Sequence, residues 1–189
     1  LLFLILLSFT VVSCFKSTPR FDLLSADQTG VDFNNVVADE DSFNILHYEY
    51  MYNGGGVGVG DLNNDSLPDL IFTANRVSSK IYLNQGDFKF LDITSNFEGL
   101  TNNQWLSGVS VVDVNADGWN DVYLTSTMSK DSLLRKNQLW INQGLTDGQV
   151  WFKEMGDQYG IADTGYSMHA AFFDYDLDGD LDLYVLNNV

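Results

Sequence analysis

The chain has 189 residues, of which 45% are apolar and 14% aromatic, so it can bury a core and is not a disordered acidic tail. Its formal net charge of −17 argues against nucleic acid or another anionic polymer as a general partner. Because Cys14 is the single cysteine, the chain cannot form an internal disulfide.

The first predicted element is an apolar stretch that runs to Val12. It is shorter than the roughly 20 residues that a membrane helix needs, and it fits the core of a signal peptide. Val11-Val12-Ser13-Cys14 resembles a bacterial lipobox, in which the cysteine becomes lipidated. We therefore expect a lipoprotein signal peptide at 1–14, a tether at 15–28, and a bacterial outer-membrane or cell-surface protein anchored through lipid at Cys14. The alternative is an ordinary secretory peptide in which Cys14 is incidental.

Residues 29–52 come next and have a mixed pattern. Segments 29–35 and 42–48 each predict a strand, and we expect this N-terminal region to complete the last blade of a larger sheet assembly.

A nine-residue pattern of side-chain oxygens then appears three times, at 61–69, 113–121 and 174–182. Asp or Asn stands at positions 1, 3, 5 and 9, and position 7 can offer its carbonyl oxygen. Such an oxygen set suits Ca²⁺ better than Mg²⁺, which keeps its water and demands octahedral geometry. The expected ligands are Asp61, Asn63, Asp65, Leu67 and Asp69; Asp113, Asn115, Asp117, Trp119 and Asp121; and Asp174, Asp176, Asp178, Asp180 and Asp182.

These loops are not EF-hands, which need a bidentate Glu at position 12 and flanking helices. Position 12 is occupied by Phe72, Leu124 and Val185. Short runs rich in β-branched and aromatic residues flank each loop, so each loop is predicted to connect two strands.

The repeat extends beyond the loops. A third and a fourth strand are predicted after each of the first two loops, and both third strands end in Asn-Gln-Gly. The loops recur at roughly 50 to 60 residues, the spacing of four-stranded propeller blades. We predict an all-β chain with blade 1 at 53–100, blade 2 at 101–163 and a partial blade 3 at 164–189.

These blocks resemble the FG-GAP or VCBS repeat β-propellers, which include integrin α-subunit heads and the cartilage acidic protein group. The resemblance is carried by Gly54–Asp61, Val111–Gly118 and Phe173–Asp180. It implies about seven blades in a complete propeller, so we expect this chain, with two and a half, to be a fragment. Ser66 departs from the glycine that the family carries at position 6, which makes the first loop the weakest predicted calcium site.

The chain offers little material for catalysis, and we expect no enzyme activity. His169 is expected to be packed or to line a pore. The four tryptophans can form a sugar-stacking platform, although Trp140 is better explained as core.

The 126–136 insertion lies at the edge opposite the loops, carries three of the nine basic residues and is a candidate binding surface, with a plain solvated loop as the alternative.

We expect a calcium-binding propeller lipoprotein that binds or adheres to a glycan or a protein partner at the cell envelope. The alternatives are the propeller portion of a calcium-dependent carbohydrate-active enzyme and a purely structural assembly module. The sequence does not fix its oligomeric state.

Overall fold

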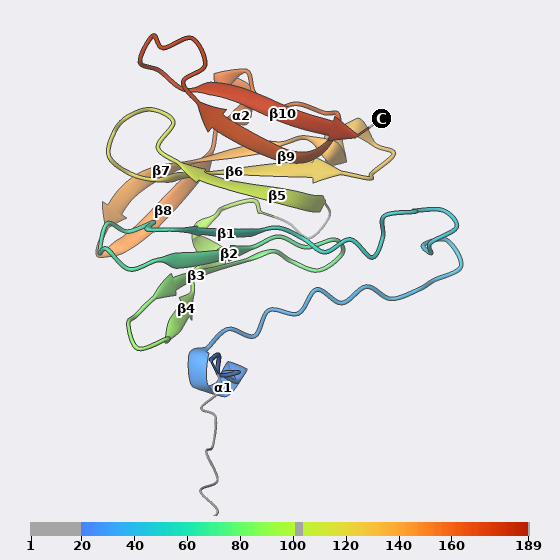
Figure 1. Cartoon of the computed structure of the whole chain (residues 1–189), viewed down its shortest axis with the longest axis horizontal. Helices are drawn as coiled ribbons and strands as arrows, with labels where there is room; N and C mark the ends of the chain where they lie inside the picture. The colour runs from blue at the N-terminus through green and yellow to red at the C-terminus, as the bar shows by residue number, and fades with distance from the viewer. Residues whose placement is uncertain (1–19, 101–103, 189) are drawn as a thin grey trace, which may run out of the picture.

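The described residues form three antiparallel sheets that follow one another along the chain (Figure 1). The computed structural model describes residues 20–100 and 104–188, so the predicted signal peptide and Cys14 lie outside the described part. No helix within the described part is long and apolar enough to cross a membrane. The strands are β1 (Val57–Gly60), β2 (Asp69–Phe72), β3 (Lys80–Asn84), β4 (Phe90–Asp92), β5 (Trp105–Val112), β6 (Asp121–Thr127), β7 (Gln138–Thr146), β8 (Gln149–Glu154), β9 (Tyr166–Phe173) and β10 (Asp182–Asn188).

The first two sheets are four-stranded meanders, with the strand orders β1-β2-β3-β4 and β5-β6-β7-β8, and β9 pairs with β10 in the third. This confirms the predicted all-β chain built from four-stranded antiparallel sheets. The last residue of each first strand pairs with the acidic residue that ends the loop, as Gly60 does with Asp69 and Val112 with Asp121. The same register in all three sheets places the three loops equivalently.

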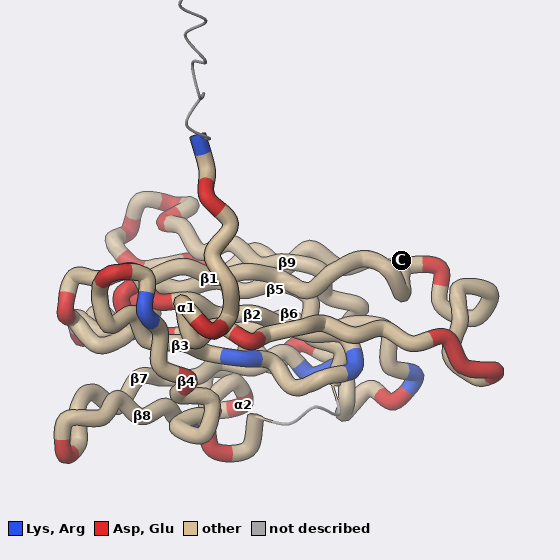
Figure 2. The backbone as a smooth tube through the Cα atoms, turned by 90° about the horizontal axis from the view of Figure 1, so that it is seen from below, with Lys and Arg blue, Asp and Glu red and all other residues tan. Residues whose placement is uncertain are grey.

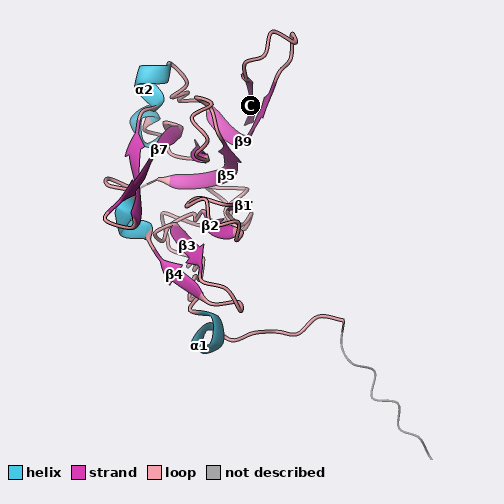
Figure 3. Ribbon diagram, turned by 90° about the vertical axis from the view of Figure 1, so that its left-hand side faces the viewer, coloured by secondary structure: helices cyan, strands magenta, loops and turns pink. Residues whose placement is uncertain are grey.

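The sheets pack through their first strands, because β5 lies between β1 and β9 (Figure 3). Gly58 and Gly60 permit this close approach. A Cβ atom at either position would lie 2.5 Å from a methyl carbon of Val109 or Val111 on β5. The glycine-rich run before the first loop is therefore required by packing between sheets.

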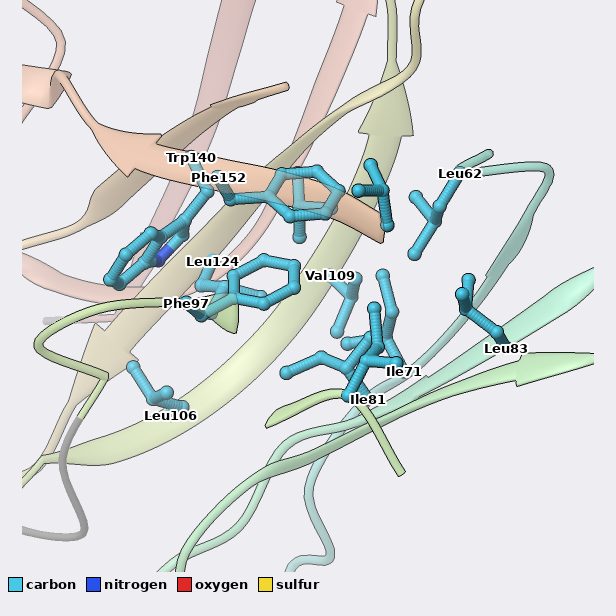
Figure 4. Packing of buried hydrophobic residues seen from close by; sticks show 13 residues of the cluster. Leu62, Ile71, Ile81, Leu83, Phe97, Leu106, Val109, Leu124, Trp140 and Phe152 are labelled. Carbon is cyan, nitrogen blue, oxygen red and sulfur yellow. The ribbon is translucent and has the colours of Figure 1, made fainter. Parts of the chain in front are cut away.

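The main core lies between the first and second sheets (Figure 4). Trp140 is 1% exposed within it, as expected for a core residue. Its ring meets Phe97 at a centroid distance of 5.4 Å, and Phe97 stacks on Phe152 at 4.0 Å. A second cluster, which includes Tyr123 and Ala170, joins the second sheet to the third.

The N-terminal region differs from the prediction. No strand forms at 29–35 or 42–48; the described residues before β1 contain the helical turn α1 (Ala26–Thr29), further turns, and a single bridge between Glu40 and Phe43. Part of this segment lies against the face of the first sheet, while Phe43 and Tyr48 contact Trp105 of the second. Phe33 stacks on Phe72 at 5.0 Å, and the Tyr82 hydroxyl donates to Asp32 at 2.7 Å.

Three other short helical turns complete the described structure. They are η1 (Thr94–Asn96), η2 (Ser132–Arg135) and α2 (Gly156–Tyr159). The η2 turn lies in the 126–136 insertion, where Asp131 accepts a hydrogen bond from the Leu133 N–H at 2.9 Å. Arg135 holds the insertion by donating to the carbonyls of Ser129 and Thr164.

Candidate metal centres in three equivalent loops

The three acidic loops lie at one edge of the sheets, at the left of Figure 1. We call them loop 1 (61–69), loop 2 (113–121) and loop 3 (174–182). They share one backbone conformation, in which positions 4 and 6 both have positive φ. The φ values are 60° and 68° at Asn64 and Ser66, 56° and 88° at Ala116 and Gly118, and 63° and 97° at Leu177 and Gly179.

The aspartate at position 1 organises each loop by accepting backbone N–H groups. Asp61 accepts from Asp65 at 3.2 Å and from Ser66 at 2.7 Å. Asp113 repeats this pattern in loop 2, at 3.1 and 2.8 Å. In loop 3, Asp174 accepts from Gly179 at 3.2 Å. Positive φ at position 6 turns that N–H inward, so Ser66 adopts the conformation that the sequence predicted to be unfavourable for it.

Position 9 has a structural role that the sequence did not reveal. Asp69 is fully buried, and its two oxygens accept the N–H groups of Leu62 and Asn84, each at 2.7 Å. Asp121 does the same with Val114 and Asn142, at 3.0 and 2.8 Å. These two carboxylates tie loops 1 and 2 to the third strand of their own sheets, whereas Asp182 of loop 3 accepts the Tyr175 N–H at 2.8 Å.

Burial raises the pKa of Asp69 to about 6, although the two backbone N–H groups oppose the shift. Desolvation raises the pKa of Asp121 to about 6 in the same way. Both values refer to the metal-free protein, and a bound cation would favour the ionised form.

Loop 3 has the donor set best suited to a cation. Asp174, Asp176 and Asp182 place one oxygen each within 4.8 Å of one another. In the chain as described, no other group of three His, Cys, Asp or Glu side chains comes so close. Asp174 Oδ1 is buried and accepts no hydrogen bond, and it is the only buried side-chain N or O atom of the described residues without a partner. Repulsion from Asp178 raises the pKa of Asp180. An oxygen-binding cation would satisfy the unpartnered oxygen and relieve this repulsion, so the residues fit Ca²⁺.

Loops 1 and 2 partly satisfy their own oxygens. The Asn63 amide donates to Asp65 at 3.0 Å, and the Asn115 amide donates to Asp117 at 2.9 Å. At position 7, the Leu67, Trp119 and Asp180 N–H groups donate to the position 5 carboxylates of their loops at 2.8, 2.9 and 3.1 Å. The predicted ligands of all three loops are therefore local neighbours, and loop 3 brings its acidic groups closest together.

Amide side chains join loop 1 to the second sheet and to loop 2. Asn142 donates to the Leu62 carbonyl at 2.8 Å, and Asn120 donates to the Asp61 carbonyl at 2.8 Å. In the opposite direction, Asn64 donates to the Gly118 carbonyl at 3.0 Å. The repeated Asn-Gln-Gly motif marked Asn142 as a recurring position in the sequence. The motif did not show that the Asn142 side chain bonds to the preceding sheet.

The remaining candidate residues are dispersed. His169 lies on β9 and is exposed, so the prediction of a packed residue is wrong, although its Nδ1 atom lies 2.8 Å from where a Cβ on Gly108 would be. Trp105 and Trp140 are buried, so the four tryptophans do not form one platform, whereas Trp151 is 39% exposed.

Two comparisons with known proteins bear on these loops. Residues 61–124, from loop 1 to β6, match the sequence model of the FG-GAP-like repeat. The chain is also similar to a protein of Plasmodium yoelii yoelii described as "T-cell immunomodulatory protein homolog", with 29% identity over 135 residues. That alignment covers 66% of this chain and 19% of the relative, so the chain matches about a fifth of that protein's length. The predicted resemblance to FG-GAP repeats is confirmed.

Proposed function

We propose, from the premise that residues 61–124 form an FG-GAP-like repeat, that this chain is part of a calcium-stabilised β-propeller that binds a glycan or protein partner. The three sheets would be successive blades, with the calcium loops at one edge and the recognition surface elsewhere. The buried, unpartnered Asp174 Oδ1 beside Asp176 and Asp182 is the observation that carries the calcium assignment.

The proposal places this module outside the cytoplasm. Acidic residues far outnumber basic ones along the described backbone (Figure 2), and such a protein suits a compartment rich in calcium. The predicted lipobox would anchor it to a bacterial envelope membrane through Cys14, and we propose a binding role without catalysis. Labelled fatty acid should be incorporated by the chain expressed in a bacterium but not by Cys14→Ser, and equal labelling would contradict the anchor.

Calcium titration tests the central claim. Calcium should bind the chain in calorimetry and raise its thermal midpoint, because a ligand that binds only the folded state stabilises it by mass action. Asp174→Asn should weaken binding at loop 3, whereas Asp147→Asn, in the exposed β7–β8 turn, should not. An unchanged melting midpoint on chelation, together with no calorimetric binding, would contradict the proposal.

A further inference from the structure

Two hydrogen bonds run in opposite directions between loop 1 and loop 2. Asn64, at position 4 of loop 1, donates to the Gly118 carbonyl at 3.0 Å. Asn120, at position 8 of loop 2, donates to the Asp61 carbonyl at 2.8 Å. The paired residues are 54 and 59 positions apart in the chain, so packing of the first sheet on the second brings them together. Each loop thus gives its neighbour one donor and one acceptor.

In loop 2, the bonded carbonyl belongs to a peptide group that also serves a predicted calcium ligand. The carbonyl of the Gly118–Trp119 peptide accepts from Asn64, and the N–H of the same peptide donates to the Asp117 carboxylate at 2.9 Å. Because a peptide group is planar, a bond that fixes the direction of its carbonyl also fixes the direction of its N–H. Asn64 of loop 1 therefore helps to orient Asp117 of loop 2.

Loop 1 repeats this arrangement. The carbonyl of the Asp61–Leu62 peptide accepts from Asn120, and the N–H of that peptide donates to the Asp69 carboxylate at 2.7 Å. Asn120 of loop 2 therefore helps to orient Asp69 of loop 1, through the same planar geometry. Hydrogen bonds in such a chain also polarise one another.

Loops 2 and 3 lack these two donors. Ala116 stands at position 4 of loop 2, and Leu181 stands at position 8 of loop 3. Neither apolar side chain can donate a hydrogen bond to a neighbouring loop. The backbone is the same in both cases, since φ is 60° at Asn64 and 56° at Ala116. The side chains alone therefore distinguish the joined pair of loops from the other pair.

We infer that Asn64 and Asn120 are positioning residues that couple the calcium sites of loops 1 and 2, so that each bound cation strengthens binding at the other loop, whereas loop 3 binds independently. This inference rests on the proposed calcium binding and describes how those sites regulate one another.

The coupling comes from shared ordering. With a cation held in loop 1, Asn64 is fixed where it orients the Gly118–Trp119 peptide, so loop 2 loses less conformational entropy on binding. Linkage requires an equal factor in the opposite direction. Repulsion between the two cations opposes the coupling. Loops 1 and 2 each have three carboxylates and stay anionic with a divalent cation bound, and salt at about 0.15 M screens the remaining repulsion.

Calcium titration followed by amide NMR resolves the three sites. The position 6 N–H of each loop donates to the position 1 carboxylate of the same loop, so the signals of Ser66, Gly118 and Gly179 report on loops 1, 2 and 3. Asp65→Ala removes a ligand from loop 1 and should weaken calcium binding at loop 2 about fivefold. Asp178→Ala removes a carboxylate from loop 3, controls for the lost charge and should leave loop 2 unchanged.

Replacing both asparagines should uncouple the loops. Asn64→Ala combined with Asn120→Leu introduces the residues found at the equivalent positions of loops 2 and 3. In this background Asp65→Ala should change calcium affinity at loop 2 less than about twofold. Thermal unfolding in chelator checks that the combined variant is folded. Asn64→Ala alone, at an exposed position, should also reduce the coupling and serves if the combined variant does not fold.

Equal loop 2 affinity in the parent and Asp65→Ala chains would overturn the inference. An equal effect of Asp178→Ala, or a fivefold effect that persists without the two asparagines, would do the same. These three results leave the proposed calcium binding intact, because the loops would still bind calcium. If none of the three signals responded to calcium, the proposed calcium binding and the coupling would fall together.

Discussion

The acidic residues of each loop do two kinds of work. Asp121 is buried and holds two backbone N–H groups, whereas Asp117 is exposed and accepts hydrogen bonds within its own loop. From the sequence, Asp117 and Asp121 were both predicted to be calcium ligands. Their burial separates a carboxylate needed for folding from one needed mainly for a cation.

Asp121→Ala should destabilise the chain even in chelator, because it leaves the Val114 and Asn142 N–H groups buried and unbonded. The expected loss is about 2–5 kcal/mol in the free energy of unfolding by urea. Asp117→Ala is the matched control and should cost less than about 1 kcal/mol in chelator. Equal losses for the two variants would contradict the structural role of position 9.

Ser66→Gly should stabilise loop 1, because Ser66 is held at a φ of 68°, where a non-glycine residue is strained by about 1 kcal/mol. The gain in unfolding free energy should be roughly 0.5–1 kcal/mol, and calorimetry should show tighter calcium binding at this loop. Ser78→Gly is the control, since Ser78 is exposed and does not have positive φ. A loss of stability for Ser66→Gly would show that its hydroxyl matters more than the strain.

At the scale of elements, loops and sheets are joined by amide side chains. Asn142 is buried in the middle of β7 and donates to the carbonyls of Leu62 and Asn120. Asn84, the equivalent residue of the first sheet, donates to Pro68 within its own sheet. The same Asn-Gln-Gly motif therefore closes a loop in the first sheet and also joins two sheets in the second.

Asn142→Ala should lower the free energy of unfolding by about 2–4 kcal/mol, since it removes buried hydrogen bonds to two carbonyls and to the Gly144 N–H. Asn84→Ala should cost about 1 kcal/mol, because Asn84 is only partly buried. Urea unfolding measures both, and hydrogen exchange of β1 and β5 should accelerate only for Asn142→Ala. Similar exchange in both variants would argue against a bond that couples the sheets.

At the scale of the whole molecule, the stack of sheets has one face covered by the N-terminal segment. Phe33 and Asp32 cover Phe72 and Tyr82, which lie on the side of the first sheet that faces away from the second. Tyr82 is fully buried there, and burial is the main cause that raises its pKa. The segment replaces a neighbouring sheet at this end of the stack.

Phe33→Ala should therefore destabilise the chain by about 1–2 kcal/mol, through the lost ring stacking and the exposure of Phe72. Val36→Ala, at an exposed position of the same segment, should have little effect. Thermal unfolding and dye binding to exposed apolar surface measure both. Equal thermal midpoints and equal dye binding for the two variants would mean that the N-terminal segment does not protect this face of the first sheet.

The sequence by itself determined the strands that flank the three loops, the loops between them and the sheet type, because each depends on residues close together in the chain. The run of β-branched and aromatic residues at Val122-Tyr123-Leu124, and the oxygen pattern from Asp113 to Asp121, indicate a strand and a turn without distant partners. It also located the candidate ligands, since a nine-residue loop brings its own side chains together.

Only the tertiary structure decided which of these groups are buried, shared or joined. Asn142 and Leu62 are 80 residues apart, and their bond depends on how the second sheet packs on the first. The segment before β1 has strand-like residues, yet it forms no strand, and Phe33 instead stacks on Phe72 from the face of the first sheet. Such features depend on long-range contacts, and local sequence patterns carry no information about which distant surfaces will meet.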